Sequence, residues 1–199
     1  MSPRTALQNQ HIRDERREEI LHAALGVFAR MGFEATKIAD VAAASDMSHG
    51  LIYRYFPSKE AAFVALVELA VQGGLRLTEE ALANVGTPWD RLRVLCERLL
   101  AGVQSRPEYP LIIVQAYASG TIPEAARSLL RRYGEQTHRN VAQLIRQGQA
   151  AGQVRTGNAD ELAAILLAMI QGLAVDRLET HTARRPFPRA HTFVDLFRV

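Results

Sequence analysis

The chain has 199 residues, of which 48% are hydrophobic and 23% are charged, a balance that is ordinary for a globular protein. A single cysteine, Cys96, excludes an internal disulfide and favours a reducing compartment. The net charge is +3, and residues 1–60 carry equal numbers of basic and acidic side chains, so bulk charge does not predict a nucleic-acid partner. We expect no signal peptide and no membrane span, and therefore a cytoplasmic protein.

Apolar residues recur every three or four positions along the whole chain, which predicts an all-α fold. Residues 1–12 are polar, and we expect them to form a flexible tail. Residues 13–58 are expected to form a small helical domain that begins with a helix at Arg13. Gly32 is a suitable residue to end that first helix, because glycine readily adopts the left-handed conformation found at helix C-termini.

Two short helices joined by a tight turn follow the first helix, and this order is typical of a helix-turn-helix. Thr36 is expected to cap a helix over residues 37–44, and Ser48 is expected to cap the next one. Asp46 lies in the turn, where a residue that tolerates positive φ is needed. Pro57 cannot continue the second helix, which must therefore end before it.

The second short helix has two chemically different faces. Ile52 and Phe56 are expected to point inward, whereas Gly50, Tyr53 and Arg54 lie on the opposite side. Glycine has no Cβ, so a foreign backbone or base edge can approach it closely. A helix N-terminus also favours phosphate oxygens, and tyrosine hydroxyls and nearby cations can hold them. The tyrosines could instead be core aromatics of a small helical domain.

The rest of the chain predicts longer helices. We expect a connecting helix over residues 59–74, ending at Gly73 and Gly74, and then a helical C-terminal domain over residues 75–199. Within that domain a helix is expected to open at Thr87, and the others are expected near residues 107–118, 122–151, 158–178 and 191–197.

The stretch ILHAALGVFARMGFEATKIADVAAASDMSHGLIYRYFPSKEAAF, from Ile20 to Phe63, resembles the DNA-binding domain of the tetracycline-repressor (TetR) family of bacterial transcription regulators. The resemblance implies an N-terminal helix-turn-helix domain, a larger helical domain for ligand binding and dimerisation, and a role in regulating transcription. We expect a repressor, with activation as the alternative that the sequence leaves open. The resemblance also implies DNA contacts at Thr36, Ser48, His49, Gly50, Tyr53, Tyr55 and Lys59. The residues themselves add Lys37 and Arg54 as candidate DNA contacts.

Residues 162–175 are apolar around nearly the whole circumference of their predicted helix, so the helix must be covered on all sides. It could be the central core helix of a monomer, or it could have one face on a twin subunit. The resemblance to the TetR family implies the second arrangement, a homodimer on a palindromic double-stranded DNA operator. The expected interface residues are Leu162, Leu166, Ile170, Leu173, Phe193 and Phe197.

The resemblance further implies that a small-molecule effector binds the C-terminal domain and releases the DNA. Polar residues that interrupt its apolar stripes could bond neighbouring backbone or line a ligand pocket. The candidate pocket residues are Trp89, Cys96, Gln115, Tyr117, Tyr133, Thr137 and Met169. Cys96 could equally be an inert buried thiol. No basic cluster lies on the apolar stripes, so we expect an apolar or aromatic effector.

No catalytic pattern is recognisable in the sequence. The histidines lack metal-ligand spacing, and a phosphate-binding glycine loop or a nucleophile elbow is missing. We therefore expect no metal, no cofactor and no enzymatic activity. An all-α enzyme and a helical interaction module without a DNA role remain alternatives, and turnover of a metabolite or failure to bind DNA would favour them.

Overall fold

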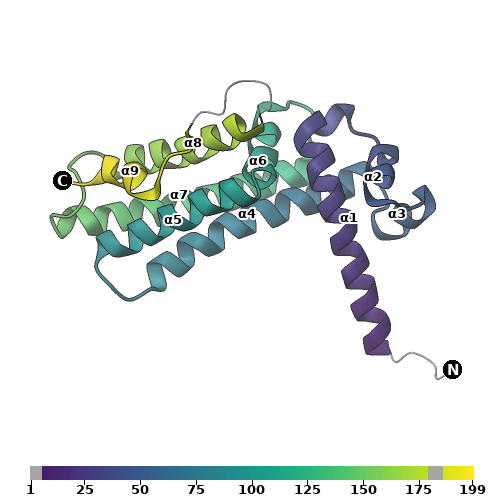
Figure 1. The fold of residues 1–199 in the computed structure, drawn as a ribbon, viewed down its shortest axis with the longest axis horizontal. Helices are drawn as coiled ribbons and strands as arrows, with labels where there is room; N and C mark the ends of the chain where they lie inside the picture. The colour runs from purple at the N-terminus through teal and green to yellow at the C-terminus, as the bar shows by residue number, and fades with distance from the viewer. Residues whose placement is uncertain (1–5, 179–185) are drawn as a thin grey trace.

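The computed structural model describes residues 6–178 and 186–199, and over these residues it contains helices and one isolated β-bridge. The elements are α1 (Ala6–Ala35), α2 (Ile38–Ser45), α3 (His49–Tyr55), α4 (Lys59–Ala83), α5 (Pro88–Ser105), α6 (Glu108–Ala118), α7 (Glu124–Ala150), α8 (Ala159–Leu178), α9 (Ala190–Val194) and the short 3-10 helix η1 (Asp195–Phe197). The molecule is elongated, with α4, α5, α7 and α8 along its length and α1 to α3 at one end (Figure 1). The predicted all-α fold is confirmed for these residues.

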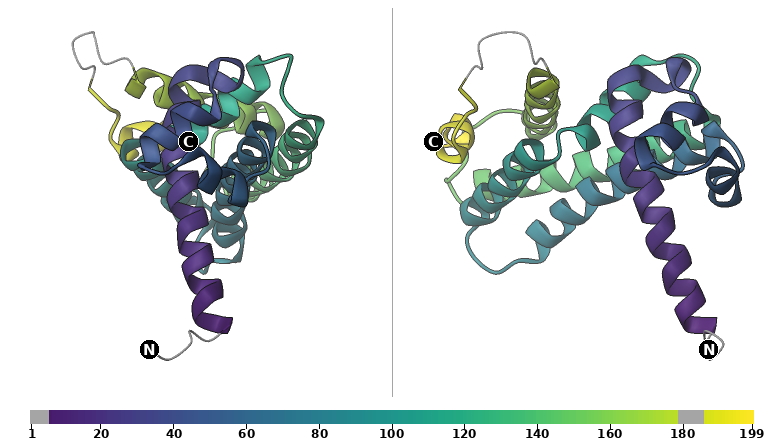
Figure 2. Two further views of the ribbon diagram at one scale, coloured as in Figure 1. Left: turned by 90° about the vertical axis from the view of Figure 1, so that its right-hand side faces the viewer. Right: turned by 45° about the vertical axis from the view of Figure 1, so that its right-hand side comes forward.

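Helix α1 begins at Ala6, so the expectation of a flexible tail over residues 1–12 was wrong for residues 6–12. Side-chain pairs one helical turn apart stabilise this part: Gln10 donates to Asp14 at 2.9 Å, and His11 lies 3.2 Å from Glu15. The N-terminal half of α1 projects away from the rest of the protein (Figure 2).

The C-terminal end of α1 is interrupted at Gly32, which has φ of 76°. This is the break that the sequence predicts at that glycine. Thr36 donates its hydroxyl to the Gly32 carbonyl at 2.7 Å, so it closes the end of α1 and is not the N-cap of α2. Lys37 takes the N-cap position instead, and its backbone N–H donates to the Asp40 carboxylate at 2.7 Å.

Helix α4 connects the helix-turn-helix end to the rest of the protein. Ser58 caps it by accepting from the Ala61 N–H at 3.2 Å. The helix does not end at Gly73 and Gly74, as we expected, but continues without interruption to Ala83. By length and composition alone α4 could cross a membrane, yet it packs against α1, α5, α6 and α7, so its apolar residues belong to the protein core.

The buried side chains form two clusters. The first cluster contains residues of α1, α2, α3, α4, α6 and α7. Within it, the rings of Phe28, Phe33 and Phe63 contact one another at centroid distances of 4.8–6.5 Å. The second cluster fills the space between α5, α7, α8 and α9. Helix α6 contributes Ile112 to the first cluster and Leu111 to the second, so it contacts both ends of the molecule.

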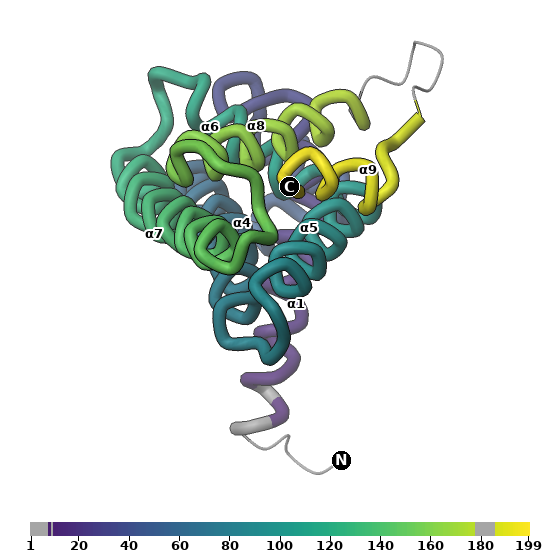
Figure 3. Tube along the Cα trace, turned by 90° about the vertical axis from the view of Figure 1, so that its left-hand side faces the viewer, coloured from purple at the N-terminus to yellow at the C-terminus, as the bar shows by residue number. Residues whose placement is uncertain are grey.

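The C-terminal segment closes the second cluster. Phe193 and Phe197 are buried, and α9 packs beside α5 (Figure 3). Val154 and Arg198 form the isolated antiparallel bridge, next to a 2.9 Å hydrogen bond from the Arg155 N–H to the Phe197 carbonyl. The brief last helix that the sequence predicts is therefore present and anchored.

Candidate DNA-binding surface and ligand cavity

Helices α2 and α3 form the helix-turn-helix. Asp46 in the turn has φ of 53°, as its position in the sequence requires. Ser48 caps α3 by accepting from the Leu51 N–H at 3.3 Å. Ile52 and Phe56 are fully or almost fully buried and anchor α3 to the first core cluster. The short helix is thus fixed at its start and along one face.

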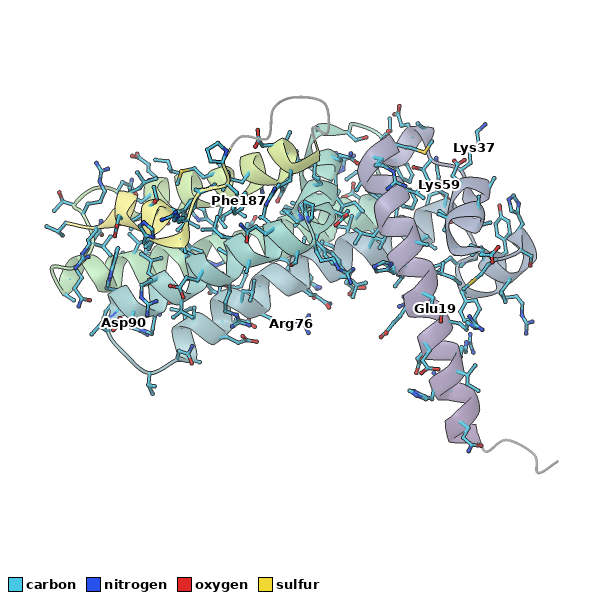
Figure 4. All side chains as sticks on the ribbon, in the orientation of Figure 1. Glu19, Lys37, Lys59, Arg76, Asp90 and Phe187 are labelled. Atoms are coloured by element: carbon cyan, nitrogen blue, oxygen red, sulfur yellow. The ribbon has the colours of Figure 1, made fainter. Side chains whose placement is uncertain are left out.

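The opposite face of α3 is open to solvent. His49, Gly50, Tyr53 and Arg54 are exposed, and a Cβ built on Gly50 would meet nothing within 4 Å. Within the described part of the chain, the side chains of His49, Tyr53 and Arg54 have no hydrogen-bonding or ionic partner. Lys37, at the start of α2, is also exposed and points outward (Figure 4). These groups offer hydroxyl, imidazole and cationic donors around a bare backbone position.

Two of the predicted DNA contacts bind their own chain instead. Thr36 is only 1% exposed, and its hydroxyl is bonded within α1. Lys59 donates through Nζ to the carbonyls of Phe33 at 2.9 Å and Glu34 at 3.1 Å, and it lies over the Phe33 ring. A cation is favourable at a helix C-terminus, so Lys59 stabilises the end of α1.

A hollow beside α3 brings together residues that lie far apart in the sequence. It is lined by Ile12, Arg13, Leu51, Arg54 and Tyr55. Tyr55 is half-buried, packs against the first core cluster and lines this hollow. The sequence did not suggest Arg13 as a candidate DNA contact. Its pattern indicates where the first helix begins, but not that this helix lies beside α3.

A cavity of about 730 Å³ lies among α4, α5, α6, α7 and α8. This volume is within the range of ligand-binding pockets. Its walls contain many small residues, which leave room that longer side chains would fill: Ala70, Gly73, Gly74, Gly102, Gly134, Ala164 and Ala168. A glycine inside a helix lowers the stability of the fold by roughly 0.5–1 kcal/mol relative to alanine. At Gly73 and Gly74 the space that side chains would occupy is left open.

Two of the seven predicted pocket residues, Tyr117 and Thr137, line the cavity. Tyr117 donates its hydroxyl to the Leu130 carbonyl at 3.2 Å, and that hydroxyl lies 2.7 Å from the place of a Cβ on Gly134. Partial burial of the hydroxyl, and then the nearby Glu135 carboxylate, raise the pKa of Tyr117. Thr137 has no hydrogen-bonding partner among the described residues.

The other five predicted pocket residues lie outside the cavity wall: Trp89, Cys96, Gln115, Tyr133 and Met169. Tyr133 accepts hydrogen bonds from Gln72 and Arg132, Trp89 lies under the Arg198 guanidinium, and Met169 packs on the second core cluster.

Cys96 is fully buried, and burial raises the pKa of its thiol to about 12. The alternative of an inert buried thiol is the one that the structure supports.

Gln115 has the most informative contact of this group. Its amide donates to the Ala29 carbonyl of α1 at 2.6 Å. The Gln115 amide nitrogen thus bonds neighbouring backbone, as the alternative interpretation of this residue expected, and it links α6 to α1. The side-chain carbonyl oxygen of Gln115 is buried without a hydrogen-bonding partner.

The residues expected at the dimer interface lie mainly inside the chain itself. Leu162, Leu166 and Ile170 face the second core cluster, as do Phe193 and Phe197, and Leu173 packs partly against it. In this structure they are not a surface open to a twin subunit. The outward face of α8 carries other small and apolar residues, Ile165, Gly172 and Val175, whereas Ala164 and Ala168 of the same helix line the cavity. Sequence periodicity could not distinguish these faces because both are apolar.

Metal ligands do not gather anywhere in the part of the chain that the structure describes, where no three His, Cys, Asp or Glu side chains are placed to hold an ion.

Two sequence profiles match the chain. The profile of bacterial regulatory proteins of the tetR family matches residues 20–66, which contain the helix-turn-helix. The profile of the BetI-type transcriptional repressor C-terminal domain matches residues 88–195, which contain the helices from α5 onward. The first match ends within α4, and the second begins after that helix has ended.

Solved structures resemble the protein over almost its whole length. The MbdR regulator from Azoarcus sp. CIB is 26% identical, with a TM-score of 0.77 over 90% of this chain and 95% of that one. A protein from Saccharomonospora viridis, described as a transcriptional regulator in complex with choline, is 25% identical, with a TM-score of 0.68 over 92% of this chain and 93% of that one.

Among curated relatives, the transcriptional repressor KstR of Mycolicibacterium smegmatis is 34% identical over 93 residues, or 47% of this chain and 46% of that protein. The chain spans about half the length of the curated relatives it matches. The profile matches and the structural similarity agree with the helix-turn-helix and the cavity domain described above. The chain therefore belongs to the tetR family of bacterial regulatory proteins and has a C-terminal domain of the BetI type.

Proposed function

We propose that the protein is a ligand-responsive, DNA-binding transcriptional repressor that binds its operator as a homodimer in the cytoplasm. The observation that carries this proposal is the continuity between two sites: the exposed polar face of α3 and the cavity are joined by the single uninterrupted helix α4. A surface for DNA and a space for a small molecule thus share one rigid element. No catalytic role is assigned to any residue.

On the DNA side, α3 would enter the major groove with His49, Gly50 and Tyr53 toward the bases and backbone. Lys37 and Arg54 flank this face and would contact phosphates. Thr36 and Lys59 support the surface from behind, because Thr36 closes the end of α1 and Lys59 bonds that end to α4.

On the ligand side, binding in the cavity would favour one position of α4 and α6 over another. Gly73, Gly74 and Thr78 of α4 line the cavity, while the start of the same helix holds α1 through Lys59. Helix α6 offers a second connection, because Tyr117 lines the cavity and Gln115 bonds α1. A ligand shifts the equilibrium only by its difference in affinity for the two positions.

The homodimer would form through the outward face of α8 defined above, not through the residues that the sequence suggested. The small residue Gly172 allows close approach of a second helix, and Ile165 and Val175 supply exposed apolar surface, at 50% and 41% exposure. Two copies with their α3 helices about 34–36 Å apart would match half-sites one helical turn apart.

Footprinting with the full chain on the DNA upstream of its own gene tests the proposal. We expect a symmetric protected tract whose affinity falls about 10³–10⁵-fold between 50 and 200 mM salt, as for a protein with 6–10 phosphate contacts. A DNA fragment of equal length and unrelated sequence is the control. Absence of protection, or equal protection of both fragments, would contradict a role as a specific regulator.

A further inference from the structure

We propose that the effector of this cavity is an organic anion, a carboxylate carried on an apolar body. The proposal rests on the proposed function, since it assumes that the cavity binds the regulatory ligand. It replaces the expectation of a purely apolar or aromatic effector, which was based on the absence of a basic cluster in the apolar stripes. The positive charges come instead from residues outside those stripes.

The charged residues of the cavity wall are all basic. Arg76 of α4 and Arg106, which follows α5, both line the cavity, and His138 lines it from α7. Among the described residues that line it, none is acidic. Glu108 and Glu135 are neighbours of lining residues in the chain, but they are not part of the wall. The wall itself therefore presents an anion with two guanidinium groups, whereas the Glu135 carboxylate reaches the cavity only from outside the wall, where it adds to the effect of burial in raising the pKa of Tyr117.

The two guanidinium groups are also available. Within the described residues, neither Arg76 nor Arg106 has an ion-pair or hydrogen-bonding partner for its side chain, and both are exposed enough to reorient. Other arginines nearby are engaged: Arg93 pairs with Glu97 at 2.6 Å, and Arg98 pairs with Glu80. Arginine binds carboxylates through paired N–H donors, so these two positions are suited to a carboxylate group.

The remainder of the wall fits an apolar body. Leucine and isoleucine side chains dominate it: Leu69, Leu77, Leu99, Ile113, Leu167 and Ile170. Thr137 and Tyr109 add hydroxyl groups that have no partner among the described residues. The ligand that matches this distribution has an apolar chain or ring in the interior and its carboxylate toward Arg76 and Arg106. Arg76 lies partway along the helical body, well away from α3 (Figure 4).

Calorimetric titration of the full chain, without DNA, tests the charge preference directly. The probes are decanoate, decan-1-ol and decyltrimethylammonium, which share an apolar chain and differ in charge, each below its micellar concentration. We expect decanoate to bind at least about tenfold more tightly than the alcohol, and the cation to bind most weakly. Equal binding of acid and alcohol, tighter binding of the cation, or no binding of decanoate would overturn the proposal.

A double variant tests whether Arg76 and Arg106 cause the preference for decanoate. Arg76→Gln combined with Arg106→Gln is expected to abolish the preference for decanoate while leaving the affinity for decan-1-ol unchanged. Arg155→Gln is the matched control, because Arg155 is exposed, its side chain has no partner among the described residues, and it lies outside the cavity. A preference for decanoate that survives in the double variant would show that the anion is held elsewhere and would reject the proposal.

Footprints on the operator, recorded with the same preparations, distinguish failure of the ligand proposal from failure of the proposed regulatory function. If the operator is protected but the carboxylate preference is absent, the inference about the ligand fails and the regulatory function stands. If decanoate binds as expected but no operator is protected, the regulatory function fails. Thermal unfolding of the double variant should match that of the unaltered chain, since both arginines are exposed.

Discussion

The two ends of the molecule differ in how their side chains are divided between core and surface. Helix α3 buries Ile52 on one face and exposes polar groups and a bare glycine on the other. Helix α8 has apolar residues on both faces, and only one of them is buried within the chain. The short helix α3 can therefore present a polar surface to DNA while it buries only one face in the core. Helix α8 also buries one face in the core, but its exposed face is apolar and is available to another chain.

The largest effect is expected from a charge placed on the inner face of α8. Leu166→Asp would put a carboxylate where the side chain is fully buried, without a partner. We expect a loss of at least about 4 kcal/mol in the free energy of unfolding, and an unfolded or insoluble chain. Chemical denaturation followed by circular dichroism measures this, and a folded variant of nearly normal stability would contradict the burial.

A carboxylate on the outer face of α8 should affect association between chains rather than folding. Ile165 is the neighbouring residue but is half exposed, so Ile165→Asp should leave the fold of one chain intact. We expect sedimentation to give a monomer where the unaltered protein gives a dimer. A dimer that persists would move the proposed interface away from this face.

Two glycines give a second contrast between the ends. A Cβ on Gly148 of α7 would lie 2.3 Å from Cγ2 of the buried Val154, so Gly148→Ala requires Val154, in the connection between α7 and α8, to shift. Overpacking of this kind costs about 1–3 kcal/mol. Thermal unfolding should show the loss, and unchanged stability would indicate that this contact adjusts freely.

Gly50→Ala is the counterpart at the DNA-binding end. A Cβ there meets nothing within 4 Å, so stability should rise by about 0.4–1 kcal/mol as the unfolded chain loses freedom. Operator affinity should nevertheless fall, because the added methyl group lies on the face proposed to approach DNA. A variant that is more stable and binds the operator equally well would exclude close approach at this position.

Lys59 distinguishes structural support from DNA contact. Lys59→Met removes the two hydrogen bonds to the end of α1, and we expect a loss of about 1–2 kcal/mol in stability. The slope of DNA affinity against salt concentration should not change, because a phosphate contact is not lost. A reduced slope would restore the role that the sequence first suggested for this lysine.

The smallest effect is expected for Tyr53→Phe. The ring is half exposed and its hydroxyl has no partner among the described residues, so stability should stay within about 0.5 kcal/mol. Operator affinity should fall by about 0.5–1.5 kcal/mol if the hydroxyl bonds a phosphate. Quantitative binding at fixed salt measures it, and equal affinity would remove this hydroxyl from the interface.

The sequence predicted contacts between residues that are close together in the chain, but not contacts between residues that are far apart in it. The turn at Asp46 and the cap at Ser48 depend on neighbours three or four residues away, so the sequence predicted them. Lys59 binds carbonyls 25 and 26 residues away, and the local pattern could not reveal that contact. The cavity wall is drawn from five helices, and Arg76 and Arg106 show no relation in the linear sequence.

The projecting half of α1 has a consequence for its local stability. Residues 13–19 are all exposed, so these turns gain little from tertiary packing and persist mainly as a continuation of the anchored half. Isolated helices shorter than about 12–15 residues are marginal in water, and such a segment frays from its free end. Amide hydrogen exchange should accordingly slow progressively from Ala6 toward Ile20, without a sharp step, long before the whole protein unfolds.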